Sequence, residues 1–275
     1  FGQFTHVMKI IRVFPRRTNA TPTDENARVG YPGLFDECDE VHISVTFSWD
    51  IPLAEKLYKA WSAIAPTKIG GPALGDRGEE FESGMYLKKG YTITSRGCPN
   101  HCWFCDVWKR EGKIRELQIK EGNNILDSNL LACSQKHQEE VFKMLLTQKN
   151  VRFTGGLEAK RFTQWHVFWL LTIKPKAVFF AFDTFDDWEP LVDAVTLLKN
   201  NKIKLNHIYR CYVLIGYGSD TLTKAESRLK AVLSLGLMPQ AMLFNRRIDT
   251  QWRKLQREWA NPTILGSKMR GNDIG

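Results

Sequence analysis

Three cysteines stand within eight positions of one another, in the segment Cys98-Pro-Asn-His-Cys102-Trp-Phe-Cys105. Thiolates are the ligands that iron-sulfur clusters prefer, and zinc also binds them well. Three thiolates on a 4Fe-4S cluster leave one iron without a protein ligand, and a catalytic metal site requires such an open position. The spacing therefore predicts a 4Fe-4S cluster held by Cys98, Cys102 and Cys105, with one open iron.

Two other kinds of metal site are alternative interpretations of these cysteines. A structural zinc ion needs a fourth ligand, and His101 would complete a Cys3His set. The adjacency of His101 and Cys102 counts against this set, because neighbouring side chains in an extended loop diverge. A cluster that only transfers electrons would show a fourth cysteine nearby, whereas the next one along the chain is Cys133.

The other cysteines, Cys38, Cys133 and Cys211, are scattered along the chain. Six cysteines with three packed together are typical of intracellular metal chemistry rather than of a disulfide framework. We therefore expect a cytoplasmic protein. Cys133 and Cys211 could donate a hydrogen atom or bind a metal, but we expect them to be small core residues.

The chain has 39 basic and 30 acidic residues, a net charge of +9. This balance permits binding to a phosphate-rich partner and favours a nucleotide or nucleic acid as substrate. The basic residues occur in pairs such as Arg16-Arg17 and Lys88-Lys89, so a solvated basic surface remains the alternative. No apolar run reaches the roughly 18 residues of a membrane span, and we expect no membrane association.

Residues 1–88 predict a small α/β region. Short apolar or β-branched runs at residues 9–14, 41–47 and 67–70 are typical of strands, and residues 15–39 are polar enough to be loop. Asp50 stands where a helix N-cap would, before apolar residues at helical spacing. We expect residues 1–7 to precede the natural start at Met8.

Residues 89–247 alternate between predicted strands and amphipathic helices. Such alternation favours parallel strands joined by right-handed crossovers, curled into a barrel or part of one. In a barrel of this kind the chemistry lies at the carboxyl ends of the strands, and the cysteines directly follow the first strand. Residues 248–275 predict a closing helix and a tail. The strand candidates are residues 91–95, 123–126, 151–154, 177–182, 208–215 and 239–244, and the main helices residues 137–146, 162–171, 188–198 and 224–235.

The CxxxCxxC pattern, with aromatic Phe104 before its last cysteine and a predicted strand before the loop, resembles the signature of the radical S-adenosylmethionine (SAM) superfamily. The resemblance covers about residues 90–245. It implies a partial (β/α)6 TIM-like barrel, an oxygen-sensitive 4Fe-4S cluster, bound SAM and a one-electron reductant such as flavodoxin or ferredoxin. The preceding region is similar in placement to the cobalamin-binding domain of one branch but lacks its Asp-x-His-x-x-Gly motif, so we do not expect cobalamin.

The resemblance also implies SAM contacts near the cysteines and at the second and third strands. Phe104 belongs to the cysteine motif itself. Asp127 and Ser128, which Asn129 follows, resemble the polar groups that meet the SAM amino end, although a turn or helix cap is equally compatible. Gly155 and Gly156 would let the backbone approach the cofactor, and Glu158 could accept a hydrogen bond from it, unless the segment is a plain turn.

Further contacts are implied at the later strands. Asp183 would meet a ribose hydroxyl, or else cap the next helix. Ile215 would pack on the adenine. Arg161 would bind the SAM carboxylate, unless it forms a surface ion pair. No catalytic residue beyond these is assigned.

The function implied is reductive cleavage of SAM to a 5'-deoxyadenosyl radical that modifies a substrate. The basic balance favours a nucleotide or nucleic acid as that substrate, and the alternative is a peptide or small metabolite. No second-cluster extension or RNA-binding barrel resembling those of the family is present in the sequence. The alternative of another class is a non-enzymatic module that binds zinc.

Overall fold

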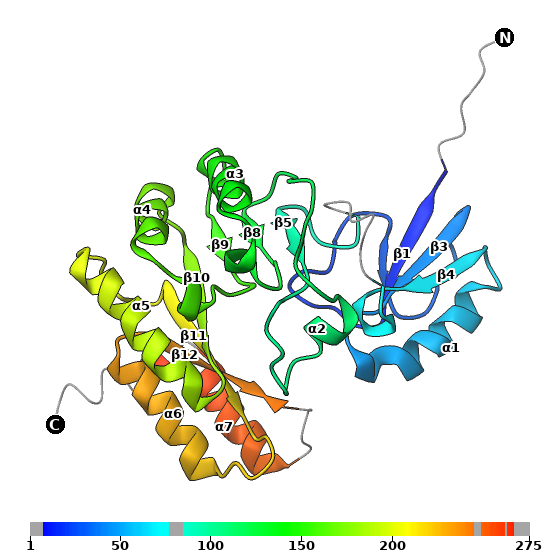
Figure 1. Cartoon of the computed structure of the whole chain (residues 1–275). Coiled ribbons are helices and arrows are strands. Elements are labelled where there is room, and N and C mark those ends of the chain that lie inside the picture. The colour runs from blue at the N-terminus through cyan, green and yellow to red at the C-terminus, as the bar shows by residue number, and fades with distance from the viewer. Residues whose placement is uncertain (1–7, 77–84, 245–248, 262, 267–275) are drawn as a thin grey trace. The chain divides into compact units, whose positions relative to one another are not determined.

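The computed structural model describes residues 8–76, 85–244, 249–261 and 263–266, so the expected extension at residues 1–7 lies outside the described residues. The chain forms two compact units, Phe1–Gly122 and Asn123–Gly275 (Figure 1). The boundary that we expected at residue 88 therefore lies inside the first unit. Both units are mixed α/β structures with parallel sheets, as predicted.

The first unit contains a four-stranded parallel sheet in the order β2-β1-β3-β4. Helix α1 (Ile51–Trp61) lies along it (Figure 1). The expectation that residues 15–39 form only loop is wrong, because β2 pairs with β1 there. A strand this short shows no alternating pattern in the sequence. The strands are β1 (Ile10–Phe14), β2 (Ala27–Val29), β3 (Glu40–Ser44) and β4 (Thr67–Gly70).

One face of this sheet is buried together with α1. Alternate residues of a strand point to the same face, so Ile11 and Val13 of β1 share a core with Val41 and Ile43 of β3. Trp61 of α1 is fully buried in this core and donates its indole N–H to the Gly30 carbonyl at 3.0 Å.

The remaining elements of the first unit precede or follow the cysteine segment along the chain. The predicted strand at residues 91–95 is interrupted, because Ser95 and Arg96 pair with an antiparallel partner instead of continuing it. The segment itself lies between β6 and α2. The elements are β5 (Tyr91–Thr92), β6 (Ser95–Arg96), α2 (Val107–Arg110) and β7 (Arg115–Glu116), and earlier 3-10 turns cover Ser48–Asp50 and Pro72–Leu74.

In the second unit, the strands lie in the order β12-β11-β10-β9-β8 and all pairs are parallel. Spatial order therefore follows chain order, as expected for successive strand-helix repeats. The strands are β8 (Asn124–Ile125), β9 (Arg152–Phe153), β10 (Ala177–Phe182), β11 (Tyr209–Ile215) and β12 (Met238–Leu243).

In the described part of the second unit, helices follow these strands, and each of those named below overlaps a helix that the sequence predicted. Short 3-10 turns, Leu130–Ala132, Ala159–Arg161 and Phe185–Asp187, begin three of the connections. None of the helices in the described parts of the chain has the length and apolar character needed to cross a membrane. The helices are α3 (Gln135–Leu146), α4 (Gln164–Ile173), α5 (Trp188–Asn200), α6 (Leu222–Ser234) and α7 (Thr250–Ala260).

Candidate metal and cofactor sites

The cysteine loop begins at a glycine that no other residue can replace without movement. Gly97 has φ +86°, and a Cβ atom there would lie 2.2 Å from the Lys113 carbonyl oxygen. The next residue, Cys98, donates its N–H to the Gly112 carbonyl at 3.1 Å. The backbone at Gly97 is therefore in close contact with the segment that follows α2. This contact fixes the position of Cys98.

A buried carboxylate also binds the first residue of the cysteine loop, Gly97. Glu111, which is 6% exposed, accepts a hydrogen bond from the Gly97 N–H at 2.9 Å. Its other oxygen lies 3.4 Å from the Arg96 guanidinium. Sequence reasoning missed Glu111, because a lone carboxylate in a basic segment gives no sign of which backbone N–H it will meet.

The three thiols are partly buried, and none of them forms a disulfide. Burial raises the pKa of the Cys105 thiol, and the nearby Cys98 thiol raises it further, against the lowering effect of the Val107 N–H. The charges of two thiolates thus disfavour each other in this loop. A bound metal cation would offset that cost, because thiolates are the form that binds metals.

Aromatic side chains border the loop. The Trp108 indole N–H donates to the Cys102 carbonyl at 3.2 Å, and the His101 ring packs on Trp108 with ring centroids 4.9 Å apart. Phe104 meets Trp103 edge to face at 5.4 Å. His101, the possible fourth zinc ligand, is exposed and lies against an indole.

The donor set of the loop fits an iron-sulfur cluster chemically. It offers three reduced thiols, Cys98, Cys102 and Cys105, on one short turn, in which the Cys105 N–H donates to the Cys102 carbonyl at 3.1 Å. Among the described residues, no group of three or more His, Cys, Asp or Glu side chains is already arranged to hold a metal ion.

Polar side chains meet at the ends of β8 and β9 in the second unit. The Asn129 side-chain amide donates to the Glu158 carboxylate at 2.8 Å, and the Arg161 guanidinium donates to the same oxygen at 2.7 Å. The two residues that precede Asn129 are also shielded from solvent: Asp127 is buried, and Ser128 is partly buried. The structure thus joins Asn129, Glu158 and Arg161 in one cluster. Arg161 forms an ion pair, which was the alternative to its binding the SAM carboxylate.

The two glycines after β9 have different roles. A Cβ atom on Gly155 would lie 2.5 Å from the Asp127 carbonyl oxygen, so Gly155 allows the ends of β8 and β9 to approach each other. Gly156 has φ +93°, and a Cβ atom there would meet its nearest neighbour, the Phe179 carbonyl oxygen, only at 3.9 Å. Of the two glycines, only Gly156 therefore has open space where a side chain would otherwise lie.

Asp183 follows β10 and faces β11. Its carboxylate accepts the Leu214 N–H at 3.1 Å. Burial raises the pKa of Asp183 to about 7, and the nearby Asp187 charge adds to the rise, while the Leu214 N–H and Arg228 act in the opposite direction. The 3-10 turn that leads into the next helix has Thr184 as its N-cap, and the Thr184 N–H donates to the Asp187 carboxylate at 2.8 Å, so the capping role left open for Asp183 belongs to Thr184.

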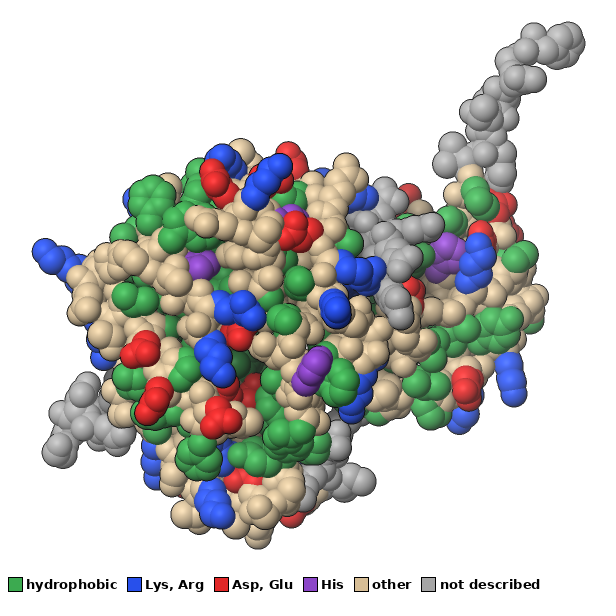
Figure 2. Space-filling view, in the orientation of Figure 1, with side chains coloured by type: hydrophobic (Ala, Val, Ile, Leu, Met, Phe, Trp, Pro, Cys, Tyr) green, Lys and Arg blue, Asp and Glu red, His purple; other side chains and the backbone are tan. Residues whose placement is uncertain are grey.

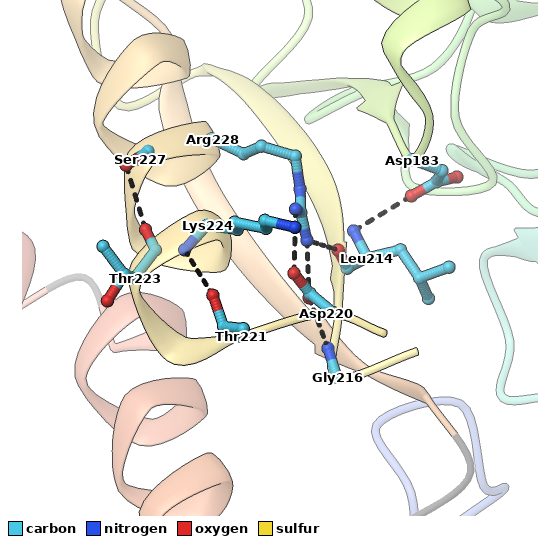
Figure 3. Close-up of polar contacts among 9 residues, drawn as sticks. All are labelled: Asp183, Leu214, Gly216, Asp220, Thr221, Thr223, Lys224, Ser227 and Arg228. Carbon is cyan, nitrogen blue, oxygen red and sulfur yellow. Dashed lines mark hydrogen bonds and ion pairs between the residues drawn. The ribbon is translucent and has the colours of Figure 1, made fainter. Parts of the chain in front are cut away.

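A buried ion pair supports the end of β11 (Figure 3). Arg228 of α6 donates to both carboxylate oxygens of Asp220, at 3.0 and 2.7 Å, and also to the Leu214 carbonyl at 2.9 Å. Asp220 in turn accepts the Gly216 N–H at 2.9 Å. Ile215, between these anchored residues, is fully buried. Sequence reasoning missed this pair, whose members are eight residues apart.

On the face shown in Figure 2, lysine and arginine side chains are scattered among acidic and apolar ones and form no dense basic patch. This distribution agrees with the paired spacing of basic residues in the sequence.

No protein-family model matches the chain, and no curated protein matches it.

Proposed function

We propose that this chain is a radical SAM enzyme. The observation that carries the proposal is the loop of Cys98, Cys102 and Cys105, in which three reduced thiols with CxxxCxxC spacing lie on a turn anchored by Gly97 and Glu111. Three thiolates suit a 4Fe-4S cluster with one open iron. When bound, such a cluster supplies the electron that cleaves SAM to a 5'-deoxyadenosyl radical.

The strand ends of the second unit supply groups suited to SAM. The cluster of Asn129, Glu158 and Arg161 offers a donor amide, a carboxylate and a cation for the charged methionine end. Asp183 offers a carboxylate for the ribose hydroxyls, and Ile215 an apolar side chain for the adenine. We further propose that Phe104, Asp127, Ser128, Gly155 and Gly156 border this cofactor.

We also propose that the alternating strands and helices form a partial (β/α)6 TIM-like barrel. The sequential order of the parallel strands in the second unit supports this arrangement. In such a barrel the groups at the carboxyl ends of the strands share one site. The protein would then orient SAM and the substrate and exclude water from the radical.

The net charge of +9 favours a nucleotide or nucleic acid as substrate over a peptide or small metabolite. A one-electron donor such as flavodoxin or ferredoxin would reduce the cluster, and a cytoplasmic location would suit both. The second candidate is a zinc-binding module without catalytic activity. The position of His101 inside the cysteine loop is the observation that favours it.

Metal analysis of the anaerobically reconstituted full chain separates the two candidates. We expect about four iron and four sulfide per chain, and loss of both in Cys102→Ala. Cys38→Ala, which removes a partly buried thiol far from the loop in sequence, is the matched control and should keep its iron. One stoichiometric zinc per chain, or equal iron in Cys102→Ala and the wild type, would contradict the proposal.

A further inference from the structure

The connections that enter β9, β10 and β11 share one edge of the sheet in the second unit. β10 pairs in parallel with both of its neighbours, so the amino ends of the three strands lie side by side (Figure 1). There the Lys176 N–H donates to the Val151 carbonyl at 2.7 Å, and the Val178 N–H donates to the Ile208 carbonyl at 2.8 Å. Because adjacent strands are only about 4.8 Å apart, the three connections form one continuous strip.

This strip is basic throughout. Residues 147–152, 172–177 and 199–210 contain no aspartate or glutamate. Within the described parts of the chain, no carboxylate forms an ion pair with a lysine or arginine of the strip. All these basic side chains are exposed except that of Arg210, which is partly exposed. We call the set the basic edge, and it consists of Lys149, Arg152, Lys174, Lys176, Lys199, Lys202, Lys204 and Arg210.

The opposite edge of the same sheet carries acidic residues. Asp127, Glu158, Asp183 and Asp220 follow β8, β9, β10 and β11 in turn. Since the strands are parallel, these carboxylates lie at the carboxyl edge, away from the basic edge. The unit is therefore electrically polar, and a polyanion is attracted to its basic edge alone.

Two arginines of the basic edge lie close enough to repel each other. Burial lowers the pKa of Arg210, and the charge of Arg152 lowers it further. The contacts of Arg210 among the described residues are with neutral groups, because its Nε donates to the His207 carbonyl at 2.9 Å and its guanidinium lies over the Phe179 ring, 5.5 Å from the centroid. A bound anion would offset this repulsion.

Two lysines of the basic edge occupy backbone positions that favour glycine. Lys174, at the end of α4, has φ +54°, and Lys202, after α5, has φ +58°. A Cβ atom makes this left-handed conformation costly, whereas glycine adopts it freely. Each position thus keeps a positive charge at the edge at the expense of backbone strain.

We propose that the basic edge of the second unit binds the phosphate backbone of a nucleic acid. The strip is rich in lysine and has no exposed aromatic ring, so its contacts would be with phosphates and independent of base sequence. Lysine is depleted in protein interfaces, which favours a nucleic acid over an acidic protein as the partner.

The distance between the two edges favours a polymer over a mononucleotide. β11 has seven residues, so the basic edge lies roughly 20 Å from the carboxyl edge, where the proposed chemistry would take place. Only an extended substrate can reach both. The choice of nucleic acid rests on the function proposed above, whereas binding itself needs no cluster.

Fluorescence anisotropy of a labelled DNA duplex, titrated with the full chain before and after cluster reconstitution, tests the site at a series of salt concentrations. Lys176→Glu/Lys204→Glu should weaken binding about tenfold and reduce the slope of log K against log salt by about two. The matched control is Lys56→Glu/Lys59→Glu, which makes the same charge change at exposed positions of α1 and should weaken binding by roughly twofold or less.

A second variant separates binding from folding. Lys174→Gly/Lys202→Gly removes two charges and relieves the strained backbone, so it should unfold in urea at the same or a higher concentration than the wild type. It should nevertheless bind the duplex about fivefold more weakly. Loss of fold cannot produce this combination.

The proposal is overturned if the duplex does not bind at about 100 µM protein, or if the lysine variants of the basic edge bind it as tightly as the control. Displacement of the duplex by polyglutamate at equal charge concentration would assign the edge to an acidic protein and overturn it too. A chain that binds the duplex but forms no 5'-deoxyadenosine would contradict the proposed enzyme activity alone. One that forms 5'-deoxyadenosine without binding the duplex would contradict the basic edge alone.

Discussion

Arg228 and Asp220 form a two-point ion pair that is almost entirely buried, with side chains 5% and 1% exposed. The pair also reaches the backbone on either side of Ile215, at Leu214 and Gly216. Removal of the arginine alone would leave a buried carboxylate without its cation, which is among the more costly changes that a protein interior undergoes.

We therefore expect Arg228→Ala to lower the free energy of unfolding by roughly 3–5 kcal/mol. The control is Lys230→Ala on the same helix, which breaks an exposed pair with Glu226 and should cost about 0.5 kcal/mol or less. Urea unfolding of the full chain followed by circular dichroism measures both. Equal losses in the two variants would contradict the structural role of the buried pair.

The cysteine loop offers a comparison between two glycines. Gly97→Ala would place a Cβ atom against the Lys113 carbonyl, whereas Gly112→Ala meets no atom within 4 Å, although both residues have positive φ. Gly112→Ala should therefore cost about 1 kcal/mol and keep its iron. Gly97→Ala should lose most of the iron measured after reconstitution. If both variants bound equal iron, the close contact between Gly97 and Lys113 would not be what positions the cysteines.

The raised pKa of Asp183 predicts a pH dependence of stability. Below pH 4 the carboxyl group is protonated in both the folded and the unfolded chain. As the pH rises from 4 to about 7, the unfolded chain ionises while the folded chain still holds the proton, so Asp183 destabilises the fold increasingly over this window.

Asp183→Asn removes this penalty and can still accept the Leu214 N–H. We expect the variant to gain stability relative to the wild type as the pH rises from 4 to 8, in thermal unfolding at a series of pH values. Asp186→Asn, at an exposed carboxylate, should show no such trend. A difference between Asp183→Asn and the wild type that stays constant with pH would refute the assignment.

His166 has the opposite dependence. Burial lowers its pKa to about 4. Its Nδ1 accepts the Thr163 N–H at 2.9 Å, so Nε2 carries the proton and donates to Gln138, also at 2.9 Å. Protonation of Nδ1 would break the first bond and place a charge in the packing between α3 and α4.

The contribution of His166 to wild-type stability should therefore fall as the pH drops from 6.5 to 4, opposite in sign to that of Asp183, because the unfolded chain takes up a proton that folded His166 resists. His166→Gln should be less stable at pH 7 but should lose less between these pH values. His207→Gln, at an exposed histidine, should follow the wild-type curve. Parallel curves for His166→Gln and the wild type would show that His166 does not titrate in this way.

The elements of the fold were largely predictable because their patterns are local. The apolar run of β10 and the spacing of Trp252 and Trp259 in α7 reveal a strand and a helix from a few adjacent residues. The three residues of β2 show no such pattern, and the two residues of β6 pair with β7 rather than extend β5.

The candidate sites were predictable only in part. The spacing of the three cysteines is itself local information. In contrast, the contact of Glu111 with Gly97 and that of Asn129 with Glu158 join residues 14 and 29 positions apart, and only the folded chain determines such partners. The raised pKa of Asp183 could not be predicted from the sequence either, because it depends on burial and on Asp187 rather than on the position of Asp183 in the chain.

The proposed activity of the cysteine loop is the reductive cleavage of SAM. To measure it, the anaerobically reconstituted full chain is incubated with SAM and dithionite, and 5'-deoxyadenosine is quantified by chromatography. We expect a brown protein that forms 5'-deoxyadenosine, and no product from Cys102→Ala. A colourless protein that holds one zinc ion and forms no 5'-deoxyadenosine would contradict the claim.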